Sequence, residues 1–145
     1  MRIYLDNCCF NRPFDDQDSL TVRLETEAKL HVQQMVKEGK LFLCWSYILD
    51  FENAANPFEE RRVEIQRWEE LAAESVMETR GILAGSRLAT SKGMKALDAL
   101  HLACAQEMKC AVFLTVDKGI LRKAGVFDDI RILSPIDFVI EREGV

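Results

Sequence analysis

The sequence has little of what marks secreted, membrane or fibrous proteins. Only seven of its 145 residues are glycine and three are proline, and it contains no repeat or low-complexity tract. No apolar run approaches the roughly 20 residues of a membrane helix. Met1-Arg2-Ile3 leads directly into a strand-like segment, without the apolar stretch of a signal peptide. We therefore expect a cytoplasmic protein without membrane attachment.

The cysteine spacing of a disulfide-bonded or zinc-binding protein is also missing. The five cysteines are an odd number and include no Cys-x-x-Cys pair, which indicates reduced thiols rather than a disulfide framework. A zinc site on His101 and Cys104 would need two further ligands that the sequence does not supply. The adjacent Cys8 and Cys9 suggest a redox switch, but free thiols are the simpler interpretation.

The chain lacks a net positive charge. Its 19 basic and 24 acidic residues give a net charge of −5, which argues against a surface that coats nucleic acid nonspecifically. A nucleic-acid enzyme is still compatible, because acids around a metal lower the pI while the substrate needs only a local basic rim. The candidates for such a rim are Arg12, Arg87, Lys92, Lys95, Lys118, Arg122 and Lys123.

The composition, 48% apolar and 30% charged, is typical of a globular protein, and we expect residues 1–145 to form one domain. Strands and helices are predicted to alternate, which favours a three-layer α/β/α fold with a central, mainly parallel sheet of four to five strands. The predicted strands are 2–6, 41–45, 111–116 and a last one near 131–133. After the first strand we predict a polar loop over 7–17 and a helix over 19–37, with Gly39 as its stop signal. The second strand is followed by a short helix with Glu52 and a helix that starts at Asn56-Pro57, and glycines 81, 85 and 93 are expected to interrupt the stretch before the helix around Asp98. A short helix through Lys123 and a terminal helix from Ser134-Pro135 complete the prediction.

Four acidic residues lie where an ordinary core would have apolar or small residues: Asp6, Glu52, Asp98 and Asp117. Asp6 and Asp117 end predicted strands, at the sheet edge where α/β proteins bind ligands. Asp98 is expected in the middle of a helix that is apolar nearly all round. Buried carboxylates are costly unless a cation gathers them, and Mg²⁺ and Mn²⁺ prefer such oxygen ligands.

These residues stand in four motifs that resemble the PIN-domain nucleases, a family that includes the VapC-type toxins of bacterial toxin–antitoxin systems. The motifs, in order, are IYLDN ending the first strand, SYILDFE after the second, LDALHLACA around Asp98 and FLTVDKGIL around Asp117. The chain departs from the family at Asn7, where Ser or Thr is common, and after Asp117, where many members have a further acid. Whether one or two metals bind therefore stays open.

The resemblance implies a PIN-like fold and Mg²⁺- or Mn²⁺-dependent hydrolysis of RNA phosphodiester bonds. Asp6, Asp98 and Asp117 would hold the metal, and Glu52 would be a further ligand or would position the attacking water. The residues expected to support the site or contact substrate are Asn7, Asn11, Arg12, Ser46 and Thr115. A toxin would have an antitoxin partner, and a homodimer is expected from the family.

Other interpretations stay open. A catalytically silent PIN module that binds RNA or a partner protein would have the same motifs. A phosphoacceptor receiver domain would need an aspartate at the end of the middle strand, where Trp45-Ser46 stands, and a haloacid-dehalogenase-type phosphatase would need Asp-x-Asp in place of Asp6-Asn7-Cys8. His101 is either a general base or a core histidine bonded to a backbone carbonyl.

Overall fold

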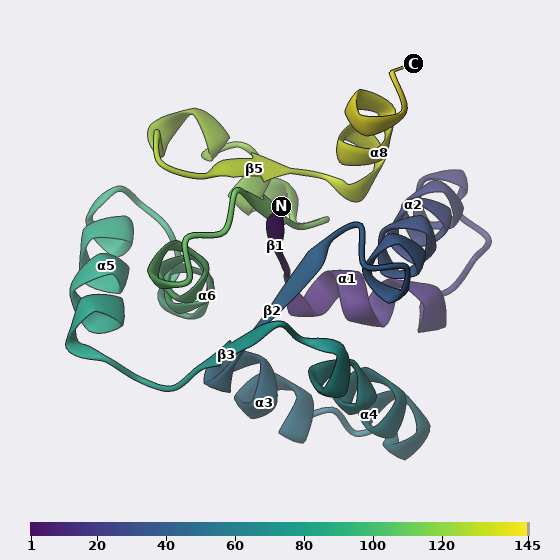
Figure 1. Ribbon diagram of the computed structural model, residues 1–145, viewed down its shortest axis with the longest axis horizontal. Helices are drawn as coiled ribbons and strands as arrows, with labels where there is room; N and C mark the ends of the chain where they lie inside the picture. Colours follow the sequence, from purple (N-terminus) through teal and green to yellow (C-terminus); the bar gives the residue numbers. More distant parts are fainter. Residues whose placement is uncertain (145) are drawn as a thin grey trace.

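The computed structural model describes residues 1–144, in which five parallel strands form one sheet of order β3-β2-β1-β4-β5. Helices α5 and α6 lie on one side of the sheet, and α1, α2 and α4 on the other, with α8 beside α2 (Figure 1). The three-layer α/β/α prediction is confirmed. The strands are β1 Arg2–Leu5, β2 Phe42–Ser46, β3 Glu74–Val76, β4 Val112–Leu114 and β5 Arg131–Leu133.

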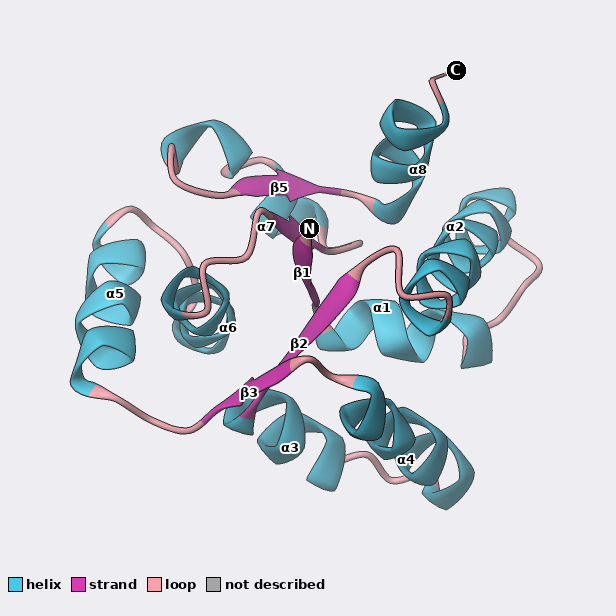
Figure 2. Ribbon diagram, in the orientation of Figure 1, coloured by secondary structure: helices cyan, strands magenta, loops and turns pink. Residues whose placement is uncertain are grey.

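The helices alternate with these strands along the chain (Figure 2). They are α1 Asn7–Asn11, α2 Leu20–Lys37, α3 Tyr47–Ala54, α4 Glu59–Gln66, α5 Arg80–Ser91, α6 Ala96–Glu107, α7 Lys118–Leu121 and α8 Pro135–Glu143, with short 3₁₀ helices η1 Arg12–Phe14, η2 Arg67–Leu71 and η3 Ala124–Val126. No helix within residues 1–144 combines the length and the apolar composition that crossing a bilayer requires.

Strand β1 is the centre of the sheet, because it pairs with β2 on one edge and β4 on the other. Ile3, Tyr4 and Leu5 are completely buried, as expected for a parallel strand covered on both faces. The Tyr4 ring stacks on that of Phe113 in β4, with centroids 5.3 Å apart. All five strands run in parallel, so the residues that follow β1, β2 and β4 come together at one edge.

Side-chain caps define several helix starts that the sequence predicts. The Ser19 hydroxyl accepts from the Val22 N–H at the start of α2, and the Ser134 hydroxyl accepts from Asp137 at the start of α8. After α2, Gly39 has φ +74°, a left-handed conformation that glycine adopts without a steric penalty.

Several local predictions were wrong. Residues 7–14 are helical rather than loop, because Asp6 caps α1 through the Asn7 N–H. Strand β3 was missed, since three half-buried or exposed residues carry almost no apolar signal. Helix α4 begins two residues later than predicted, after an Asn56 side chain that accepts from the Phe58 N–H.

Gly81 and Gly85 are inside helix α5 rather than in a loop, and they allow α5 to approach α6 closely. A Cβ at Gly85 would be 3.4 Å from the Ala103 Cβ and 3.8 Å from the Gln106 Oε1, so a longer side chain directed toward α6 would meet both residues. The position of α6, which carries Asp98 and His101, thus depends on a small residue in its neighbour.

We predict that Gly85→Leu lowers the free energy of unfolding by about 1–3 kcal/mol, because overpacking pushes α5 from α6. Gly85→Ala is the matched control: it fits, and it should raise stability by up to about 1 kcal/mol through helix propensity. Urea denaturation measures both, and equal stability of the two variants would contradict this account of the interface.

Candidate active site

The acidic residues converge on the carboxyl edge of the sheet but differ in exposure. Asp6 is buried, Glu52 and Asp98 are half-buried, and Asp117 is exposed at the start of α7. Asp98 is in the first turn of α6, not in the middle of a helix as predicted, because α6 begins only at Ala96. A carboxylate in a first turn is stabilised by the helix dipole.

Hydrogen bonds from three residues in two segments hold the Asp6 carboxylate. Its Oδ1 accepts from the Asn7 backbone N–H at 2.8 Å, and its Oδ2 accepts from the Thr115 hydroxyl at 2.8 Å. The Cys8 thiol is 3.3 Å from the same Oδ2. Thr115 also accepts from the Asp117 N–H, so one hydroxyl links the first and last acidic motifs.

Glu52 is held by two side chains. The Asn7 amide donates to Oε2 at 3.1 Å, and the His101 imidazole lies against Oε1 through Nε2. A carboxylate can only accept here, so Nε2–H is the donor and Nδ1 is left to accept. The expectation of a histidine bonded to a backbone carbonyl was therefore wrong.

The Tyr4 hydroxyl completes a chain of buried hydrogen bonds behind Glu52. It is 2.6 Å from His101 Nδ1 and 2.6 Å from the Ser46 hydroxyl, which accepts from the Leu49 N–H as the cap of α3. The sequence placed Ser46 among the residues that support the site, but Tyr4 was overlooked. The available signal was a tyrosine inside a fully buried strand, where a hydroxyl needs a polar partner.

The gathered carboxylates perturb one another. Burial raises the pKa of the Asp98 carboxyl to about 6, and the negative charges of Asp6 and Asp117 add to the effect. No hydrogen bond within the described chain, residues 1–144, partners the Asp98 side chain. It therefore bears the repulsion without a donor to relieve it.

The residues fit a hard divalent cation. One carboxylate oxygen each from Asp6 and Glu52 and the His101 Nε2 lie within 4.8 Å of one another, and because Nε2–H donates to Glu52, the ligands of this group are the two carboxylates. Asn7 Oδ1, close to this group, is a buried acceptor without a hydrogen-bond partner among residues 1–144. Carboxylate and amide oxygens are the ligands that Mg²⁺, Mn²⁺ and Ca²⁺ accept. This tightest group contains Glu52 and His101, whereas the sequence suggested Asp98 and Asp117 beside Asp6.

Asn11 and Arg12, which were expected to contact substrate, are engaged within the protein. Asn11 bonds to the Asn7 carbonyl and to the Asn56 amide. Arg12 pairs with Asp15 at 3.0 Å and with Glu25 at 3.2 Å, and so ties η1 to α2. Their observed contacts are structural.

Comparison with known proteins identifies the family. A sequence model of the PIN domain matches residues 3–126. The chain belongs to the PIN-domain family. Two solved structures share its fold: FitAcB from Neisseria gonorrhoeae, with 19% identity over 92% of this chain and 97% of that one and a TM-score of 0.59, and VapBC2 from Rickettsia felis bound to a DNA fragment from their promoter, with 10% identity over 91% and 97% and a TM-score of 0.55. No curated protein sequence gives a significant match.

The raised pKa of Asp98 predicts a pH dependence of stability in the metal-free PIN domain. The folded state holds a proton on Asp98 up to a pH of about 6, whereas the ordinary value is 3.8. The contribution of Asp98 to the free energy of unfolding is therefore fully present below pH 3.8 and is lost as the pH rises through about 6. Urea denaturation should show this decline in the wild type, and Asp98→Asn should remove that part of it. If the free energy of unfolding depended on pH identically in the wild type and in Asp98→Asn, the raised pKa of Asp98 would be contradicted.

The chain's two tyrosines provide a matched test of the buried hydrogen-bond chain. Tyr4→Phe leaves Ser46 and His101 without their shared partner and should lower the free energy of unfolding by about 1–3 kcal/mol. The buried hydroxyl of Tyr47 has no partner within residues 1–144, so Tyr47→Phe should be neutral or stabilising. Equal destabilisation of the two variants in urea would show that the Tyr4 hydrogen bonds to Ser46 and His101 contribute nothing to stability.

Proposed function

We propose that this PIN-domain protein is a Mg²⁺- or Mn²⁺-dependent ribonuclease. The observation that carries the proposal is the convergence of Asp6, Glu52, Asp98 and Asp117 at one sheet edge, beside the unpartnered Asn7 Oδ1. A cation there would offset the repulsion that raises the pKa of Asp98. PIN domains are generally nucleases, which agrees with this chemistry.

We assign these side chains two roles. Asp6, Asp98 and Asp117 would hold the ion, as the family motifs imply; Asp98 has no donor within residues 1–144, whereas both oxygens of Asp6 also accept hydrogen bonds. Both oxygens of Glu52 already accept from His101 and Asn7, which favours a carboxylate oriented to take a proton from the attacking water. A bound divalent ion would supply Lewis-acid stabilisation of the charge that develops on the phosphate.

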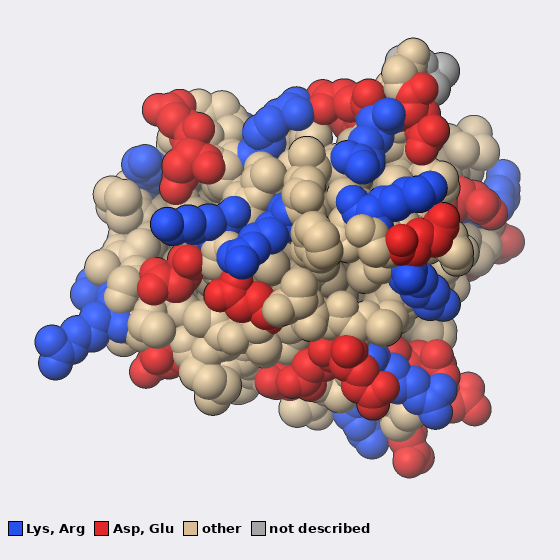
Figure 3. Space-filling model, viewed as in Figure 1, with Lys and Arg blue, Asp and Glu red and all other residues tan. Residues whose placement is uncertain are grey.

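Basic side chains beside the acids would contact the RNA backbone. Lys95 and Lys123 line a small cavity of about 70 Å³ together with Asp98 and Asp117. On the face drawn in Figure 3, basic and acidic side chains are interspersed. Because the net charge is −5, a local phosphate contact beside the site fits this protein better than an extended basic track.

We further propose the toxin role in a toxin–antitoxin module, with an antitoxin as partner. The resemblance to VapC-type toxins and the shared fold with VapBC2 support it. A homodimer is also proposed: Phe51 is 66% exposed beside an apolar hollow of about 270 Å³ lined by Tyr47, Leu83, Leu97 and Leu100. Sedimentation at several concentrations measures the dimer, and coexpression with the neighbouring reading frame tests the partner.

A cleavage assay on structured and single-stranded RNAs, in Mg²⁺ and in Mn²⁺, tests the nuclease proposal. Asp98→Asn should lower the cleavage rate by about 100-fold or more, because it removes a charged ligand. Asp128→Asn is the matched control, since this exposed aspartate precedes β5 at the opposite edge of the sheet. Cleavage that Asp98→Asn leaves unchanged would overturn the site. Metal binding without cleavage of any RNA would favour the silent PIN module instead.

A further inference from the structure

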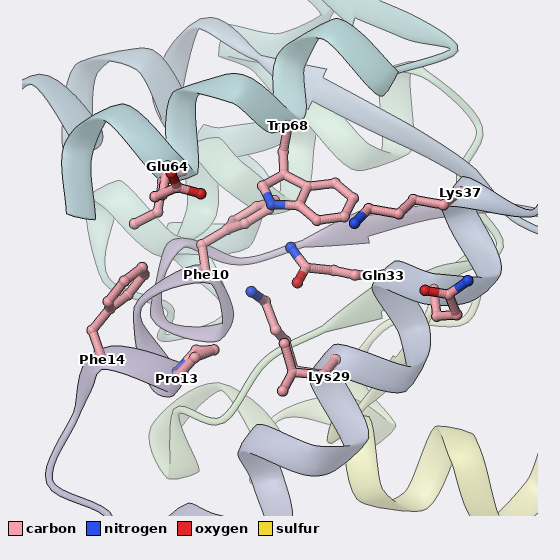
Figure 4. A pocket seen from close by; sticks show the side chains of 11 residues that line it. Phe10, Pro13, Phe14, Lys29, Gln33, Lys37, Glu64 and Trp68 are labelled. Atoms are coloured by element: carbon pink, nitrogen blue, oxygen red, sulfur yellow. The ribbon is translucent and has the colours of Figure 1, made fainter. Parts of the chain in front are cut away.

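A second cavity, of about 350 Å³, lies between α1, α2 and the α4–η2 segment (Figure 4). Its lining contains none of the four acids of the candidate active site. The lining residues are Phe10, Pro13, Phe14, Lys29, Leu30, Gln33, Gln34, Lys37, Glu64, Ile65 and Trp68. Small-molecule sites in proteins have volumes of about 300–1,000 Å³, so this cavity can hold a small ligand.

Lys29 is the unusual residue of this cavity. Its side chain comes from the buried face of α2 and is only 4% exposed, yet no carboxylate within residues 1–144 forms an ion pair with it. Its one interaction with a π system is with the Phe10 ring, 5.6 Å from the ammonium. Burial lowers the pKa of this lysine to about 8, because the charged form is disfavoured away from water. Buried charges are ordinarily paired.

Gln33, one helical turn further along α2, adds a second donor without a partner. It is also 4% exposed, and its Nε2 makes no hydrogen bond within the described residues. In Figure 4 the Lys29 and Gln33 side chains both point into the middle of the cavity. Two donors that point into the same cavity favour an acceptor group there, such as an oxyanion.

Aromatic and proline rings form part of the walls around these donors. Trp68 lies along one side with the Lys37 ammonium 5.3 Å from its ring centre, and Phe14 and Pro13 are at the other end. Glu64 also lines the cavity, on the Phe14 side, and its carboxylate pairs with Arg67 at 2.9 Å. The acid is thus balanced locally, while Lys37 lies beside Trp68 and Lys29 points into the middle of the cavity.

We propose that this cavity binds a small organic oxyanion, a carboxylate or a phosphate, carried on a planar ring. The oxyanion would accept from Lys29 and Gln33, with Lys37 at the rim, and the ring would lie against Trp68. Two classes of small molecule carry an oxyanion on a planar ring system: aromatic carboxylates and nucleoside monophosphates. The site is independent of the proposed nuclease activity.

The test uses the full chain and three probes: benzoate, adenosine 5′-monophosphate and inorganic phosphate. Calorimetry gives the affinities, and ¹⁵N-edited NMR reports on the Trp68 indole and the Gln33 amide. We expect benzoate or the nucleotide to shift both signals and to bind more tightly than phosphate, and the tighter of the two identifies the source. Phosphate that binds as tightly as both would overturn the role of the ring, and no binding by any probe would overturn the site.

Lys29→Met keeps the apolar stem and removes the charge, so it should weaken the tighter probe by about tenfold or more. Lys40→Met is the control: this exposed lysine pairs with Glu38 and is not in the cavity lining, and its loss should leave the affinity unchanged. Gln33→Met serves as a second variant should Lys29→Met fail to fold. Equal affinity in the cavity variants and the control would overturn the proposal, whatever the outcome of the nuclease assay.

Discussion

Repulsion between carboxylates is the constraint on which the rest of this structure depends. Asp6, Asp98 and Asp117 come from separate segments, and the parallel sheet brings them to one edge. Hydrogen-bond donors stabilise two of the carboxylates: Thr115 and Asn7 donate to Asp6, and His101 donates to Glu52. Asp98 has no such donor within residues 1–144, and burial together with the negative charges of Asp6 and Asp117 raises its pKa. A divalent cation is the group that would complete the balance.

The buried layer behind the acids has a separate role. Tyr4 in β1 is bonded to Ser46, which caps α3, and to His101, which projects from α6. One hydroxyl therefore fixes a strand, a helix start and a helix face relative to one another. Because Glu52 lies at the end of this chain, its orientation depends on the packing of the core as well as on solvent-side contacts.

The sequence allowed the parallel sheet, the long helix α2 and the capped start of α8 to be predicted, because each has a strong local signal. Strand β3 and helix α1 could not be predicted this way: β3 is a short, largely unburied strand, and α1 depends on a cap supplied by Asp6. The four acids were predicted to gather, as the family motifs require. The contacts of His101 with Tyr4 and Glu52 were not, because they join residues 97 and 49 positions apart, and no local pattern encodes such pairs.

The pairing of β1 with β4 has a consequence for how the site comes into existence. Asp6 meets the Thr115 hydroxyl across a separation of 109 residues, and Asp117 follows two residues later. During synthesis at about 5–20 residues per second, the first strand waits roughly 5–20 s before its partner is made. Throughout that interval the nascent chain carries Asp6 without the segment that positions it. The acidic centre is thus assembled only after β4 and Thr115 have been made, and a ribosome-bound fragment that ends before β4 lacks it.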